Sequence, residues 1–252
     1  MSYGLTKSIK QVRASSQYSQ APDSATLSVT GNLTLETWVK CEVLPNSGIG
    51  VPMMFKGDYN LINSYQLIYL NDAGTPKLEA NIYSATGNAN IATSRLTQTL
   101  TIGTWFHVAV VVTVANAIAT KFEFFINGVS SGNGVTEVIG TAPTSIFDSG
   151  VEFGLGMCGN PIFALTTYVF DGNFSLARVW ATARTQSQIS ANMCVVLGST
   201  SNLQAEWTLD NVYTDNSGNS NTLTGYNTPT FPTDTPATCA VVSNTSAFFQ
   251  FM

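Results

Sequence analysis

A short segment near the middle of the chain, residues 124–134, contains the pattern G-x-S-x-G in the sequence FFINGVSSGNG. In an α/β-hydrolase this pattern places a nucleophilic serine on a strained turn between a strand and a helix, within reach of a histidine. Here the alternation of apolar residues in KFEFFI predicts a strand, and the Asn-Gly pair that follows predicts a tight hairpin. The single histidine, His107, lies in a different strand-like run. We therefore interpret Ser130 as a hairpin residue and not as a nucleophile.

Carboxylates could support glycoside hydrolysis, which in its retaining form needs an acid and a nucleophile about 5 Å apart. Two carboxylates on the same face of one strand would meet this need, as in the triplet E-x-D-x-E. The sequence contains no such triplet, and these glutamates are each isolated along the chain: Glu36, Glu79, Glu123, Glu137, Glu152 and Glu206. The chain also has only one histidine that could act as the general base for a nucleophile. The residues predict a protein that is not an enzyme.

Oxygen-bearing side chains in two loops could hold calcium, which takes about six to eight oxygen ligands. The segment LDNVYTDNSGNSN supplies Asp210, Asp215 and Asn216, and Asp72 in YLNDAG is an outlying candidate. The alternative is a turn in which the Asp215 carboxylate accepts hydrogen bonds from backbone N–H groups. From the sequence, both a structural calcium ion and a capped turn stay open.

Charge and hydropathy argue against several classes of partner. The 252 residues carry 10 basic and 15 acidic side chains, a net charge of −5, so nothing attracts a nucleic-acid backbone. The N-terminal segment MSYGLTKSIKQVRASSQYSQ has no apolar run behind its basic residues and is not expected to be a secretory signal. The longest apolar stretch, residues 108–114, is too short to span a bilayer. The surface must be rich in Ser, Thr, Asn and Gln, which suits sugars or neighbours in an assembly.

The cysteines Cys41, Cys158, Cys194 and Cys239 are widely spaced and form no C-x-x-C pair. A zinc site is therefore not expected. Three disulfide pairings are open in principle, but without a secretory signal we expect four reduced thiols. Cys194 and Cys239 flank the C-terminal region and are the first candidates if any pair forms.

The elements that must position all these residues are short strands. Runs rich in β-branched and aromatic residues recur between Gly, Asn, Asp, Ser and Pro, for example LTLETWVKCEV, SYQLIYL, KLEANIYS and WFHVAVVVTV. This rhythm predicts an all-β protein, an antiparallel sandwich or barrel. One segment differs, because residues 182–197 place Ile189, Met193 and Val196 at helical spacing behind capping residues. It predicts one short helix.

Several of these stretches together resemble the LamG-like jelly-roll domains of the concanavalin A-like lectin and glucanase superfamily. SSQYSQAPDSATLSVTGNLTLETWVK resembles their N-terminal signature, with Tyr18 and Trp38 in the tyrosine and tryptophan positions. FKGDYNLINSYQL, GTWFHVAVVV, FDGNFSLARVWATARTQSQI and LQAEWTLDNVYTDNSGNSNTLTG resemble later elements in the same order. The resemblance spans residues 12–231 and implies a concanavalin A-like jelly-roll sandwich of two antiparallel sheets. We expect a single domain over residues 1–252, in which 232–252 form a C-terminal tail.

The leading functional hypothesis is lectin-like recognition of a glycan without catalysis, by loops at one edge of the sandwich or by its concave face. The fold by itself does not decide this, because it carries enzymes, lectins and structural modules alike. Aromatic and amide side chains suit the faces and hydroxyl groups of sugars. On this basis the candidate contacts are Tyr59, Asn60, Asn63, Tyr65 and Tyr83.

The alternative hypothesis is a structural or decoration protein of a virion or another surface assembly, which would bind protein or further copies of itself. The tail TCAVVSNTSAFFQFM ends in an apolar cluster that contains Phe248, Phe249 and Phe251. Leaving apolar surface in water costs about 25 cal/mol per Å², so this cluster should be buried on its own sheet or in a partner. The three phenylalanines are therefore the candidate assembly contact.

Overall fold

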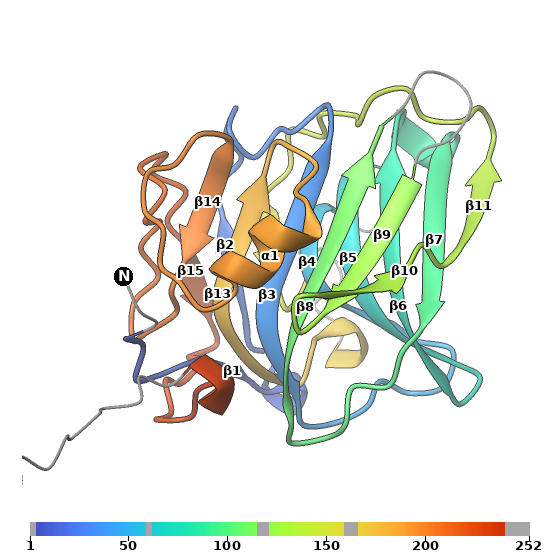
Figure 1. The fold of residues 1–252 in the computed structure, drawn as a ribbon. Helices are drawn as coiled ribbons and strands as arrows, with labels where there is room; N and C mark the ends of the chain where they lie inside the picture. Colours follow the sequence, from blue (N-terminus) through green and yellow to red (C-terminus); the bar gives the residue numbers. More distant parts are fainter. Residues whose placement is uncertain (1–3, 59–61, 115–120, 159–165, 240–252) are drawn as a thin grey trace, which may run out of the picture.

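The computed structural model describes residues 4–58, 62–114, 121–158 and 166–239, which form two β-sheets packed face to face (Figure 1). Strand pairing is antiparallel throughout the described ranges. The predicted all-β sandwich with one short helix is confirmed.

The two sheets have seven and eight strands in the part of the chain that the structure describes. The first runs in the order β1 (Ile9–Gln11), β13 (Gly172–Trp180), β3 (Leu33–Cys41), β8 (Trp105–Thr113), β9 (Lys121–Ile126) and β10 (Val129–Gly132), with β14 (Leu203–Trp207) also paired to β13. The second runs β11 (Val135–Ile139), β7 (Ile91–Thr97), β6 (Thr75–Tyr83), β5 (Asn63–Asp72), β4 (Gly50–Gly57), β12 (Phe153–Leu155), β2 (Tyr18–Ala21) and β15 (Thr224–Tyr226).

The core lies between the sheets because side chains alternate along each strand. Alternate apolar residues of β3, β5 and β6 are fully buried there: Leu33, Leu35, Val39, Tyr65, Leu67, Tyr69, Leu78, Ala80 and Ile82. Trp207 of β14 stacks on Phe153 of β12 with ring centroids 5.1 Å apart, so one aromatic pair joins the two sheets. The intervening residues of each strand therefore point to the outer faces of the sandwich.

The helix α1 (Gln186–Asn192) covers part of the outer face of the seven-stranded sheet (Figure 1). Thr185 begins it with a capping box, in which Thr185 and Gln188 bond each other's backbone N–H. Ile189 is fully buried against Val111 and Phe125. The helix is shorter than the 182–197 segment and ends with Met193 as its C-cap, whose carbonyl accepts a hydrogen bond from the Trp38 indole at 2.6 Å.

A cluster of charged side chains is buried on the same outer face, beside the end of α1. The Arg178 guanidinium donates from Nε to Glu206 Oε1 at 2.8 Å and from Nη1 to Glu36 Oε1 at 3.3 Å. All three side chains are fully buried. Arg178 also donates to the backbone carbonyls of Asn192, at 3.1 Å, and Val195. One guanidinium thus joins β3, β13, β14 and the segment after α1.

His107 completes this cluster. Its Nε2 lies 3.4 Å from Glu36 Oε2, which is longer than a typical hydrogen bond. Burial raises the pKa of Glu36, but the contacts with His107 and Arg178 outweigh burial and lower that pKa to about 2. His107 is itself fully buried.

A disulfide joins Cys194, which follows α1, to Cys239, with the two Cα atoms 5.2 Å apart. The expectation of four reduced thiols was wrong for these two residues, which are the pair that their positions made the first candidates. Sequence spacing did not reveal the bond, because the two cysteines meet only once α1 and the C-terminal segment pack on one face. Cys41 and Cys158 are free and buried.

Part of the predicted tail is bonded to the sandwich. Asp234 accepts hydrogen bonds from Lys40 Nζ and, at 2.9 Å, from the Trp105 indole. Cys239 packs against Trp38 and Leu176. The chain from residue 232 to 239 is therefore held on the outer face of the seven-stranded sheet, while Phe248, Phe249 and Phe251 lie outside the described residues.

Candidate functional site

The G-x-S-x-G segment forms the predicted hairpin between β9 and β10. Asn127 and Gly128 take left-handed conformations, with φ of 51° and 76°, which fit the turn of a two-residue hairpin. Ser130 donates to Glu123 Oε1 at 2.6 Å. The ring of His107 instead lies against Glu36 and Trp38. The interpretation of Ser130 as a hairpin residue is confirmed.

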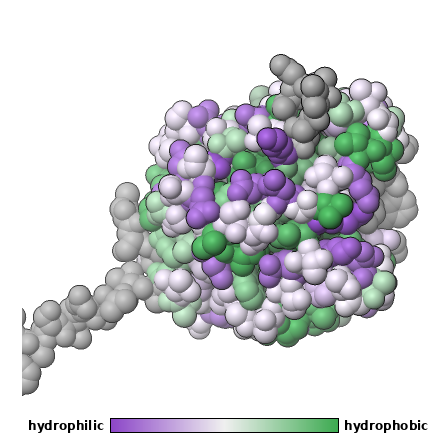
Figure 2. All heavy atoms as spheres, turned by 45° about the vertical axis from the view of Figure 1, so that its right-hand side comes forward, coloured by the Kyte–Doolittle hydropathy of each residue, from purple (hydrophilic) through white to green (hydrophobic). Residues whose placement is uncertain are grey.

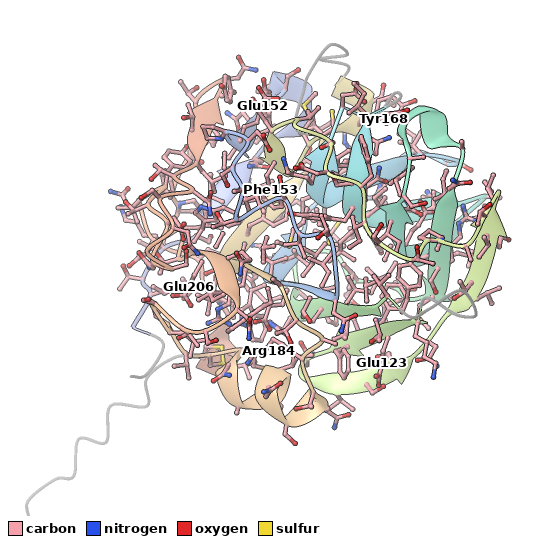
Figure 3. The ribbon with its side chains drawn as sticks, turned by 90° about the horizontal axis from the view of Figure 1, so that it is seen from above. Glu123, Glu152, Phe153, Tyr168, Arg184 and Glu206 are labelled. Atoms are coloured by element: carbon pink, nitrogen blue, oxygen red, sulfur yellow. A yellow bond between two sulfur atoms is a disulfide. The ribbon has the colours of Figure 1, made fainter. Side chains whose placement is uncertain are left out.

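The isolated glutamates do not form a free catalytic pair in the described structure. Figure 3 shows Glu123, Glu152 and Glu206 well apart on different elements. Glu206 and Glu36 do meet, but both are fully buried and Arg178 bonds to each of them. A guanidinium in this position leaves no room for a glycosidic oxygen between the carboxylates.

Asp210 and Asp215, two of the predicted calcium ligands, accept hydrogen bonds from backbone N–H groups. Asp210 Oδ1 accepts from the backbone N–H groups of Thr6, at 3.1 Å, and Lys7, at 2.7 Å. Asp215 Oδ1 accepts from the N–H groups of Glu206, at 3.0 Å, and Ser217, at 2.9 Å, and its Oδ2 accepts from Asn221 at 2.9 Å. These contacts do not fit a calcium site built on Asp210, Asp215 and Asn216, because the carboxylate oxygens face N–H donors. No group of three His, Cys, Asp or Glu residues in the described ranges could hold a metal ion.

We predict that Asp215→Asn lowers the free energy of unfolding by about 1–2 kcal/mol, because an amide nitrogen would replace the oxygen that faces the Asn221 N–H. Urea unfolding with and without EDTA measures this. We expect the chelator to shift neither the wild-type protein nor the variant. A chelator effect on the wild type that the variant lacks would restore the calcium hypothesis.

The five predicted sugar contacts fall in different environments. Tyr59 and Asn60 lie outside the described residues. Tyr65 is fully buried in the core, where its hydroxyl donates to the Leu27 carbonyl at 2.8 Å, so the structure offers no surface of this side chain to a ligand. Asn63 is also buried, at the end of the β4–β5 hairpin. Tyr83 points to the outer face of the eight-stranded sheet, because Ile82 beside it points to the core.

Tyr83 belongs to a series of hydrogen-bonded polar side chains on that outer face. Gln66 Nε2 donates to the Tyr83 hydroxyl at 3.0 Å. Asn81 Nδ2 donates to Gln66 Oε1 at 3.0 Å and to Glu79 Oε1 at 2.9 Å. Strand register makes this contact, since Gln66 of β5 stands directly opposite Asn81 of β6.

The series continues to the edge of the sheet through an arginine. Arg95 of β7 donates from Nε to Glu79 and from Nη1 to Glu137 of β11 at 3.0 Å. The contacts cross β5, β6, β7 and β11 without a break. We name this set of six residues the polar chain: Tyr83, Gln66, Asn81, Glu79, Arg95 and Glu137.

Glu79 fixes the direction of these hydrogen bonds, because a carboxylate only accepts. The amide nitrogen of Asn81 must face Glu79, and its second hydrogen faces Gln66 Oε1. Asn81 Oδ1 is then left as an acceptor, and it has no hydrogen-bond partner among the described residues although Asn81 is only 5% exposed. An unpaired buried acceptor costs about 1–3 kcal/mol. Asn81 Oδ1 is therefore the acceptor of the polar chain that still lacks a donor in the described structure.

An aromatic pair stands on the same outer face, at the opposite end of the sheet. The rings of Tyr18 on β2 and Tyr226 on β15 stack with centroids 4.8 Å apart and an angle of 7° between their planes. Tyr18 also packs with Phe55 and Met157. Tyr226 is 39% exposed, so part of this pair lies at the surface. β4 and β12 separate this pair from the polar chain, so the two are distinct features of the outer face.

A hollow of about 210 Å³ opens at one end of the sandwich, away from the polar chain. Its lining includes Thr26, Ser28 and Asn32. Thr26 and Asn32 accept hydrogen bonds from Asn221 and the Val114 N–H, and Ser28 donates to Asp148. These groups are already paired within the protein, so the polar chain is the better candidate site.

A family model described as the concanavalin A-like lectin/glucanases superfamily matches residues 13–190, and the chain belongs to this superfamily. The superfamily includes both binding proteins and glucanases. Among curated proteins, none matches the sequence. No helix in the described ranges is long and apolar enough to cross a membrane.

Solved structures share the fold. A Bacteroides ovatus protein with a proposed role in carbohydrate binding aligns with 90% of this chain at 19% identity and a TM-score of 0.65, and this chain spans 60% of its length. The SAP-like pentraxin of Limulus polyphemus aligns over 70% of this chain and 81% of its own, at 16% identity and a TM-score of 0.45. The CBM40 of Ruminococcus gnavus IT-sialidase, bound to α2,3-sialyllactose, aligns over 76% and 98%, at 13% identity and a TM-score of 0.48.

Sequence reasoning named Tyr83 as a sugar contact and considered Glu79 and Glu137 only as isolated carboxylates, and it missed Gln66, Asn81 and Arg95. The signal was present in KLEANIY, in which Leu78, Ala80 and Ile82 alternate with Glu79 and Asn81. That alternation separates a core face from a polar face within one strand. The partners on β5, β7 and β11 depend on the register between strands, which the sequence does not display.

Proposed function

We propose that this protein is a non-catalytic glycan-binding module that takes its ligand on the outer face of the eight-stranded sheet. The observation that carries the proposal is Asn81 Oδ1, a buried acceptor without a partner in the described structure, at the centre of the polar chain. Sugar hydroxyl groups supply the donor that this atom lacks. Tyr83, Tyr59 and Asn60 are further proposed contacts, and residues 1–252 are proposed to act as one module.

Two other features support this function. The superfamily to which the chain belongs includes lectins. The exposed ring of Tyr226 offers a flat apolar surface for the C–H face of a sugar. The carboxylates that meet in the described structure do so around a cation, Arg178, Arg95 or Lys40, which supports binding without hydrolysis. The Cys194–Cys239 disulfide supports an oxidising location, such as the outside of a cell.

We expect Asn81→Leu to weaken glycan binding by about tenfold or more, because leucine has nearly the same size and cannot accept a hydrogen bond. The measurement begins with a glycan array. Titration calorimetry on the strongest ligand then compares the wild-type protein with the variant.

Asn173 on β13 provides a matched control. It is 1% exposed, and its Oδ1 also has no hydrogen-bond partner among the described residues, but it belongs to the other sheet. Asn173→Leu should leave the affinity within about twofold of the wild type, and the melting temperature of each variant shows that it is folded. Equal affinities for the wild type and Asn81→Leu would contradict the proposed site.

An edge of the fold favours contact with protein as a second candidate function. Three apolar side chains on β10 and β11 are largely exposed: Val129 at 60%, Val135 at 71% and Ile139 at 58%. Figure 2 brings the side of the molecule with β11 forward and shows hydrophobic side chains in separate patches among polar ones. An exposed apolar edge strand is a site for pairing with another chain. The exposed edge therefore supports assembly as a second proposal, with Phe248, Phe249 and Phe251 of the tail as further proposed contacts.

A further inference from the structure

We infer that the polar chain selects uncharged glycans and rejects acidic ones, such as sialylated or sulfated sugars. This inference rests on the proposed glycan-binding function and concerns the charge of the ligand at the same site. It follows from the charges and donors that the outer face presents.

Arg95 is the one cation in the polar chain. Its guanidinium lies between Glu79 and Glu137, and its side chain is 35% exposed. Partial burial lowers the pKa of Arg95, but the two carboxylates outweigh burial and raise it. The arginine stays charged, and two negative charges stand around one positive charge.

A second ion pair lies on β6 and the end of β5. Lys77 lies on the same face of β6 as Glu79, because both alternate with the core residue Leu78. Its Nζ bonds to Asp72 Oδ2 at 2.6 Å. The two cations and three carboxylates of this region leave a net charge of −1. A negatively charged sugar therefore meets repulsion, within a protein whose overall charge is also −5.

The hydrogen bond that Asn81 Oδ1 lacks has a fixed direction. Asn81 Oδ1 accepts, and the carboxylates of Glu79 and Glu137 also accept. A ligand that satisfies them must donate. Sugar hydroxyl groups donate, whereas the ionised carboxylate or sulfate of an acidic glycan cannot, so such a glycan could bind here only through its remaining hydroxyl groups. Charge and hydrogen-bond direction thus favour the same class of ligand.

The test uses matched pairs of oligosaccharides on one array, each neutral glycan beside the same glycan capped with sialic acid or sulfate. We expect the neutral member of a bound pair to bind about tenfold more tightly or better at low salt, with the difference shrinking as salt screens the charges. Binding of acidic members alone would overturn the inference while the proposed function stands. Binding of neither class would overturn both.

A charge variant links the selectivity to this site. Glu137→Gln leaves Arg95 with one carboxylate and should raise the ratio of acidic to neutral affinity by about fivefold. Glu123→Gln makes the same change of charge on β9, in the other sheet, and should leave the ratio as in the wild type. Equal ratios in all three proteins would contradict selection by the polar chain.

Discussion

Replacing Arg178 with methionine is expected to lower the free energy of unfolding by about 3–5 kcal/mol at pH 7, because two buried carboxylates lose their shared cation. Methionine fills much of the same space but donates no hydrogen bond to Glu36 or Glu206. It also takes the guanidinium donor away from the backbone carbonyls of Asn192 and Val195, of which Asn192 keeps its hydrogen bond from the Val195 N–H. Urea unfolding followed by tryptophan fluorescence measures the loss.

Lys77→Met is the control for this substitution. Lys77 forms an ion pair with Asp72 at the surface, where the two side chains are 24% and 49% exposed, so its loss should cost less than about 1 kcal/mol. Adding Glu36→Gln to the Arg178→Met protein should recover part of the stability, since one unpaired charge disappears. If Arg178→Met were as stable as Lys77→Met, the buried cluster would not hold the sheet together.

The same cluster sets the response to acid. The pKa of Glu36 is lowered to about 2 from an ordinary value of 4.5. Its stabilising contribution is therefore complete above pH 4.5 and is lost as the pH falls towards 2. In Arg178→Met the pKa of Glu36 should rise, so this part of the acid dependence should shrink.

The fold was predictable because its signals are local. Each of these signals lies within about ten residues of sequence: the strand that contains Trp38, the Asn-Gly turn at residues 127–128 and the capping residues before α1. Their order along the chain matched a known arrangement of strands. Hairpins and short connections then leave few ways to pair such strands in an antiparallel sandwich.

The site was predicted in part only, because it depends on the register between strands. Tyr65 alternates with Leu67 and Tyr69, so its own strand already predicts a core position, and its aromatic ring was misleading. Gln66, one residue later, has no sequence signal that distinguishes it from any surface glutamine. It becomes part of a site only because Asn81 stands opposite it and Arg95 follows on the next strand.

The disulfide depends on packing in the same way, and its removal is expected to have a large effect. The bond closes a loop with a sequence separation of 45. Opening a loop of this length frees the unfolded chain and should lower the free energy of unfolding by about 4 kcal/mol. The double substitution of Cys194 and Cys239 by alanine tests this by urea unfolding.

Reduction of the wild-type protein by dithiothreitol should give the same loss, and the double variant should not respond to the reductant. Removal of the disulfide should also weaken the buried cluster of charged side chains. Cys194 lies between Asn192 and Val195, whose carbonyls accept hydrogen bonds from Arg178. Without the disulfide that segment is held less firmly, so Arg178→Met should cost less in the double variant than in the wild type. Additive losses of stability would show that the disulfide and the charged cluster stabilise the outer face independently. An unchanged melting temperature after reduction of the wild-type protein would show that the disulfide does not constrain the chain.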